Sequence, residues 1–194
     1  NIVSLVQSGS KDELYALFRK DTPPGEPHNP CLLPLGRVVL KVPGATLESG
    51  TLDPKTGLGT LDFAVDGKTR RAYIAMGKAS RTFAMRFPVG ADFKVEVIPS
   101  FDIPNVRKVL ASRRFGPVEW LASGDADRGG FKWALPADKS VLLSWKKSGC
   151  DVFVGTSRGG DAVDFPASFD SVRDESVAHW TKFWSVGARI SVPD

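Results

Sequence analysis

The stretch LDFAVDGKTRRAYIAM, residues Leu61–Met76, decides the fold. Every second residue from Leu61 to Val65 is large and apolar, which is the period of a strand with one buried face. Asp66-Gly67 follows, and this pair favours a tight hairpin turn because both residues tolerate positive φ. The chain then returns through Lys68–Met76 as a second strand. The stretch therefore predicts an antiparallel β-hairpin.

Similar strand patterns recur along the chain at short intervals, separated by turns that use many of its 19 Gly and 14 Pro. Such a series of short strands, without intervening long helices, is typical of antiparallel β structure and not of βαβ units. We therefore expect an all-β fold, a large sandwich of two antiparallel sheets with a helix at its C-terminal end. The other predicted strands are Gly36–Val42, Thr46–Leu52, Arg81–Phe87, Phe93–Ile98, Val118–Ala122, Phe131–Leu135, Val141–Lys146 and Val152–Gly155.

Some pairings and turns are also predicted. Ile2–Val6 and Glu13–Phe18 are expected to form a hairpin, since the residues between them are rich in turn formers. Arg81–Phe87 is expected to pair with Phe93–Ile98 around a Pro- and Gly-containing turn. Asn105–Arg114 predicts either a short helix or an irregular crossing, and the pattern leaves both open.

A helical period appears in the last residues, Ser171–Asp194, SVRDESVAHWTKFWSVGARISVPD. Val177, Trp180 and Trp184 share one face of a helix, with Phe183 beside them. Ser171 is the expected N-cap, and Gly187 is expected to end the helix. We predict a β-sandwich domain over residues 1–170. Residues 171–194 would be a linker helix and an extended lead-out toward a domain outside this chain.

Composition excludes several classes of protein. The net charge of +4 comes from 26 basic and 22 acidic residues that are evenly mixed, so no basic patch for nucleic acid or membrane surfaces is expected. No apolar run reaches the roughly 18 residues needed to span a bilayer. Cys-x-x-Cys and His-x-x-x-His are both absent, which argues against a standard zinc site, and no cofactor motif is present. Cys31 and Cys150 form either one disulfide or two separate thiols.

Three segments resemble one family. They are Leu32–Val42 (LLPLGRVVLKV), Thr51–Gly57 (TLDPKTG) and the helix pattern His179-Trp180-x-x-Phe183-Trp184. In this order they resemble the N-terminal domain of bacterial proteins related to the six-hairpin glycosidases. The resemblance implies a supersandwich, followed in the parent protein by an (α/α)6 barrel that carries the general acid and base. It also implies a periplasmic or extracellular location.

Catalytic residues are not expected within this chain. A glycosidase needs two carboxylates roughly 5 to 10 Å apart, and the acidic residues here lie on turns or on outward strand positions without an evident pair. Asp125–Gly130 lacks the Glu that completes a calcium loop, and Gly155–Gly160 lacks the Lys of a phosphate loop, so both are expected to be turns. A complete hydrolase is the alternative.

The aromatic residues offer two candidate sites. Trp120 and Trp133 flank one loop and would form a sugar-stacking platform if their rings are exposed, or core if they are buried. His179, Trp180, Phe183 and Trp184 would form a contact with the barrel domain, or else pack on the sandwich alone. The sequence thus favours a non-catalytic N-terminal module that supports the helical barrel, with an independent carbohydrate-binding module as the alternative.

Overall fold

The computed structural model describes residues 2–13, 34–121, 126–136 and 138–186, in two compact units, residues 1–34 and 35–194. The first unit contains helix α1, Ile2–Gln7, so the strand predicted over Ile2–Val6 is wrong. Its apolar residues also fit a helical period, and Gly9 ends the helix with φ +69°, where Ser10 N–H donates to Leu5 O at 3.1 Å. Residues 11–13 are helical as well, and most of the predicted strand Glu13–Phe18 lies outside the described residues.

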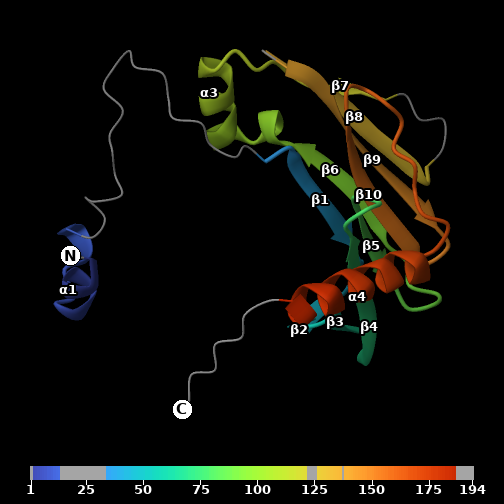
Figure 1. The fold of residues 1–194 in the computed structure, drawn as a ribbon. Helices are drawn as coiled ribbons and strands as arrows, with labels where there is room; N and C mark the ends of the chain where they lie inside the picture. Colours follow the sequence, from blue (N-terminus) through green and yellow to red (C-terminus); the bar gives the residue numbers. More distant parts are fainter. Residues whose placement is uncertain (1, 14–33, 122–125, 137, 187–194) are drawn as a thin grey trace. The chain divides into compact units, whose positions relative to one another are not determined.

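The second unit contains two antiparallel sheets and a C-terminal helix, which confirms the predicted all-β fold (Figure 1). The larger sheet has eight strands in the order β2-β3-β4-β5-β10-β9-β8-β7, and the smaller one pairs β1 with β6. The bounds are β1 Gly36–Lys41, β2 Thr46–Asp53, β3 Leu58–Val65, β4 Lys68–Gly77, β5 Thr82–Arg86, β6 Lys94–Pro99, β7 Glu119–Trp120, β8 Arg128–Leu135, β9 Asp138–Ser148 and β10 Asp151–Arg158. The helical elements are the 3₁₀ turn η1 Ser100–Asp102, α3 Pro104–Ser112 and α4 Phe169–Val186.

The hairpin expected over Leu61–Met76 is present as β3 and β4. Asp66 and Gly67 have φ values of 50° and 70°, so the turn is of the expected mirror-image type. The helical alternative for Asn105–Arg114 is the one that the structure adopts, as α3.

The predicted pairing of Arg81–Phe87 with Phe93–Ile98 is wrong. Strand β5 lies between β4 and β10, whereas β6 pairs with β1 in the other sheet. Phe87 and Phe93 stack with ring centroids 4.2 Å apart, so the connection carries the chain from one sheet to the other across the core. The turn between the strands is thus a crossover and not a hairpin.

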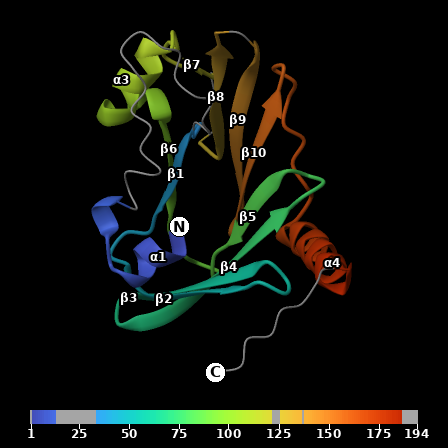
Figure 2. The same cartoon turned by 60° about the vertical axis from the view of Figure 1, so that its left-hand side comes forward.

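The large sheet has two faces, which we call inner and outer. The inner face looks toward β1 and β6 (Figure 2). Its core contains Phe63, Met85, Phe87, Phe93 and Val152, each no more than 6% exposed. Side chains of the small sheet pack against this cluster, so the two sheets share one apolar layer.

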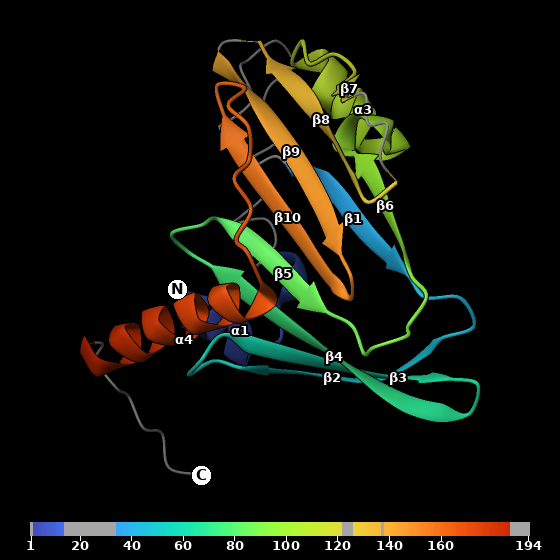
Figure 3. The same cartoon turned by 90° about the vertical axis from the view of Figure 1, so that its right-hand side faces the viewer.

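The outer face is crossed by α4 (Figure 3). Ala75 and Ala84 are neighbours in register on β4 and β5, and both are fully buried. Phe153 on β10 and Phe169 and Val172 on α4 complete this cluster. The small alanines allow the helix to approach the sheet closely. Within the described residues, no helix is both long and apolar enough to cross a membrane.

Candidate functional site

Helix α4 begins at Phe169, three residues before the start expected from an N-cap at Ser171. The N-cap is Ser168 and not Ser171. Ser171 N–H donates to Ser168 Oγ at 3.2 Å, and Ser168 N–H donates to Ser171 Oγ at 3.3 Å. This reciprocal pair is a capping box with serine in place of the usual Glu or Gln, and the Ser-x-x-Ser spacing was the signal that sequence analysis missed.

An ion-pair network joins the first turn of α4 to the sheet. Arg86 on β5 donates two hydrogen bonds to Asp151 on β10, at 2.7 and 2.9 Å, and a third to Asp170 on α4 at 2.9 Å. The Asp170 carboxylate also accepts from Arg173 at 2.5 Å. The Arg86 hydrogen bond lowers the pKa of Asp170, and bonding to Asp151 raises the pKa of Arg86. The network therefore fixes where the helix starts on the outer face.

One turn further along, Glu175 binds the turn between β4 and β5. Its carboxylate accepts hydrogen bonds from the backbone N–H groups of Ala79 and Ser80. Gly77 precedes this turn, and a side chain there would overlap the Glu175 carboxylate. The helix thus holds a hairpin end through a charged acceptor, a bond stronger than one between neutral groups.

The second half of α4 lies on the turn between β2 and β3, residues 53–57. Ser176 Oγ donates to Thr56 O at 3.0 Å, and Trp184 Nε1 donates to Pro54 O at 2.6 Å. Asp53 accepts from Lys55 N–H at 2.9 Å and from the Thr56 hydroxyl at 2.7 Å, and Thr56 lowers the pKa of Asp53. Trp180 and Trp184 therefore pack on the sandwich itself.

Large apolar side chains are exposed at the C-terminal end of α4. Phe183 is 48% exposed, and Val186 is 79% exposed. The rings of His179, Trp180, Phe183 and Trp184 contact one another edge to face in sequence, with neighbouring centroids 5.2 to 5.4 Å apart. We call these four residues the aromatic ladder. The structure brings all four predicted contact residues together in the ladder, and its C-terminal members, Phe183 and Trp184, are exposed.

A hollow of about 770 Å³ adjoins the ladder. His179 and Trp180 line it from the helix, and Leu52 and Met76 line it from β2 and β4. Leu52 and Met76 are 70% and 60% exposed, which is unusual for side chains of this size. Lys78 and Arg81 stand in the neighbouring turn, so the hollow is apolar with a basic margin.

Trp120 and Trp133 do not form a joint platform. Trp133 is 1% exposed and donates its indole N–H to Gly116 O at 2.9 Å, so it has no ring face open to a sugar. In register Trp120 lies opposite Phe131, not Trp133, and packs edge to face on that ring. Trp120 remains 54% exposed. Of the predicted pair, therefore, Trp120 alone presents a ring to solvent.

The carboxylates of the described residues are largely engaged in structural contacts. Besides the residues of the α4 network, Asp62 pairs with Arg71, an interaction that lowers the pKa of Asp62. One hollow of about 240 Å³ contains two carboxylates, Asp66 and Asp92, on its lining. Both are exposed. A hydrolytic pair needs one acid in a buried, apolar environment, and the positions of Asp66 and Asp92 do not provide one.

The described part of the chain contains few groups that could bind a metal ion or act as a reactive thiol. Within it, no three His, Cys, Asp or Glu side chains are grouped closely enough to hold a metal ion. Cys150 is a half-buried free thiol that packs against the inner core. Cys31, the other member of the disulfide alternative, lies outside the described residues.

Comparison with known proteins does not identify a family for this chain. No protein-family model matches the chain, and no curated protein matches it in sequence.

Proposed function

We propose that this chain is a non-catalytic N-terminal sandwich module of a glycoside-hydrolase-like protein, and that it supports an (α/α)6 catalytic barrel. The observation that carries the proposal is the exposed end of the aromatic ladder on a helix whose first half is fixed to the sheet. Exposed contiguous apolar surface of this kind marks a contact with another protein surface. The resemblance in the sequence supplies the identity of the partner.

The ladder and the hollow beside it define what the partner surface would present. Phe183, Val186 and Met76 call for apolar side chains, because burial of such exposed groups stabilises a contact by about 25 cal/mol per Å². Lys78 and Arg81 at the margin call for carboxylates opposite them. The barrel would therefore dock with an apolar patch bordered by acidic residues.

The experiment is a binding measurement between this chain and the barrel domain of the same gene, produced separately. We expect Phe183→Ala to weaken binding about tenfold, a loss of roughly 1.4 kcal/mol. Leu47→Ala is the matched control, since Leu47 is also an exposed apolar residue (66%) and lies outside the ladder and the hollow. Equal losses in both variants, a gene without a helical barrel, or hydrolysis of aryl glycosides by this chain alone would overturn the proposal.

Exposure of Trp120 favours a second candidate, an independent carbohydrate-binding module. Sugars stack their C–H faces on exposed indoles, and Trp120 offers such a face at the edge of the large sheet. Glycan binding by this chain that is lost in Trp120→Ala and retained in Phe183→Ala would support it. A periplasmic or extracellular location is part of both proposals, and cell fractionation checks it.

A further inference from the structure

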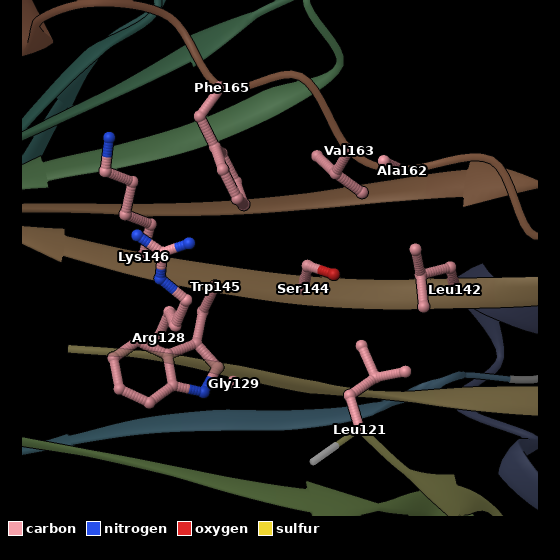
Figure 4. A pocket seen from close by; sticks show the side chains of 10 residues that line it. All are labelled: Leu121, Arg128, Gly129, Leu142, Ser144, Trp145, Lys146, Ala162, Val163 and Phe165. Carbon is pink, nitrogen blue, oxygen red and sulfur yellow. The ribbon is translucent and has the colours of Figure 1, made fainter. Parts of the chain in front are cut away.

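A second hollow, of about 300 Å³, lies on the outer face away from α4 (Figure 4). Ser144 on β9 lies at its centre. Phe165 and Val163 approach from the segment that follows β10, and Leu121 approaches from the opposite side. The volume is at the lower end of the range for small-molecule sites and suits one ring of sugar size.

The hollow exists because the strands carry small residues here. Ser144 lies in register between Gly130 on β8 and Gly155 on β10. Val163 and Phe165 occupy the space above Gly155, where a Cβ would contact both. Gly130 and Ser144 continue this row of small residues toward β8. A gap in the covering layer of the sheet therefore remains beside the Phe165 ring.

Two cations stand together at one end of the hollow. Arg128 and Lys146 are direct partners in the register of β8 and β9, and both side chains line the hollow. Guanidinium and ammonium groups both form charge-assisted hydrogen bonds, so an anion bound in the hollow could be contacted by both side chains. Lys146 makes no ion pair with any residue that the structure describes. The Ser144 hydroxyl likewise has no hydrogen bond within that part, and Figure 4 shows it directed along the hollow toward Leu142.

We propose that this hollow binds one hexuronate ring, a sugar that carries a carboxylate. The carboxylate would bind between Arg128 and Lys146, since guanidinium and ammonium groups form charge-assisted hydrogen bonds to it. The apolar face of the ring would stack on Phe165, and a ring hydroxyl would bind Ser144. The site is separate from the aromatic ladder and from Trp120, so it does not depend on the proposed function.

The test is calorimetric titration of the chain with glucuronate and galacturonate at low ionic strength. We expect a dissociation constant of about 1 mM for at least one of them. Glucose and acetate should each bind at least tenfold more weakly, because glucose lacks the carboxylate and acetate lacks the sugar ring. Titration with trigalacturonate shows whether the natural ligand is a free sugar or the end of a polysaccharide. If trigalacturonate binds at least as tightly as galacturonate, the ligand is the end of a polysaccharide. If trigalacturonate binds more weakly, the ligand is the free sugar.

Lys146→Gln should weaken uronate binding about tenfold. Lys147→Gln is the matched control with the same loss of charge, because Lys147 is adjacent in β9, points to the inner face and lies 4.3 Å from the Phe93 ring centroid. Ser144→Leu should also abolish binding by filling the hollow while both cations stay.

Several results would overturn the proposal. They are an absence of uronate binding at about 50 mM, equal affinity for glucose or for acetate, an equal loss in Lys146→Gln and Lys147→Gln, and full binding by Ser144→Leu. Thermal unfolding of each variant shows whether it is folded. Lys146→Gln and Ser144→Leu test the site independently, so either one still tests the proposal if the other does not fold.

Discussion

Gly57 lies directly against the indole of Trp180, 123 positions further along the chain. A Cβ on Gly57 would overlap Cδ1 and Nε1 of that ring and would approach Ser176 Oγ to 2.9 Å. The backbone of Gly57 also has φ +68°, a conformation that side chains disfavour. The turn between β2 and β3 and the second half of α4 are therefore fitted to each other at a point where glycine alone is accommodated.

Replacing Gly57 with alanine should consequently destabilise the protein by about 3 kcal/mol. The cost has two parts, the positive φ and the displacement of Trp180. Gly67→Ala is the control, because Gly67 has φ +70° and open space around the position of its missing Cβ. It should cost about 1 kcal/mol. Urea unfolding of both variants measures the difference, and equal midpoints would show that Trp180 does not press on Gly57.

Glu175→Ala should cost about 1–3 kcal/mol, because two backbone N–H groups of the turn between β4 and β5 lose their acceptor. Glu175→Gln should cost less, since an amide oxygen still accepts hydrogen bonds without the charge. Asp174→Asn is the control on the same helix, where an exposed carboxylate bonds to Arg173. Hydrogen exchange at Ala79 and Ser80 reports the turn directly, and unchanged exchange in Glu175→Ala would contradict the assignment.

Trp133→Ala should destabilise by about 3–5 kcal/mol, because it leaves a cavity and an unpaired Gly116 carbonyl. Trp120→Ala should cost about 1 kcal/mol, mainly the loss of its edge contact with Phe131. Thermal unfolding distinguishes a core residue from a surface one in this pair. Similar costs for both variants would mean that the two indoles share one environment, contrary to the structure.

Acid should weaken the attachment of α4. The Arg86 hydrogen bond lowers the pKa of Asp170, so this carboxylate stabilises the folded state above the unfolded pKa of about 3.9. The contribution is lost as the pH falls through the lower, folded pKa. The urea midpoint should therefore decrease below about pH 4, and the decrease should be smaller in Asp170→Asn. Identical pH profiles for the two proteins would show that Asp170 does not contribute.

Local patterns predicted most of the strands because their information lies within a few residues. The alternation in β3 and the Asp66-Gly67 turn required no knowledge of distant contacts. The strand predicted over Ile2–Val6 is part of helix α1 instead, because its apolar spacing fits both a strand and a helix. The cap of α4 was displaced because Ser168 and Ser171 are equally good capping residues, and the packing of Phe169 decides between them.

The candidate sites divide in the same way. The aromatic ladder could be predicted, since a helical period places Trp180, Phe183 and Trp184 near one another in any helix. The hollow around Ser144 could not, because it depends on Gly130 and Phe165, which reach Ser144 only through strand register and the path of a loop.

What the sequence by itself determined is the set of antiparallel strands, the tight turns and the aromatic helix, since alternation, turn residues and helical period act over neighbouring positions. Tertiary structure alone decided that β5 lies beside β10, that Arg86 meets Asp151 65 residues away, and that Gly57 receives Trp180. Such contacts join residues that are far apart in the sequence, so neighbouring positions carry no information about them. They depend on how the shapes and charges of the folded helix and strands fit one another.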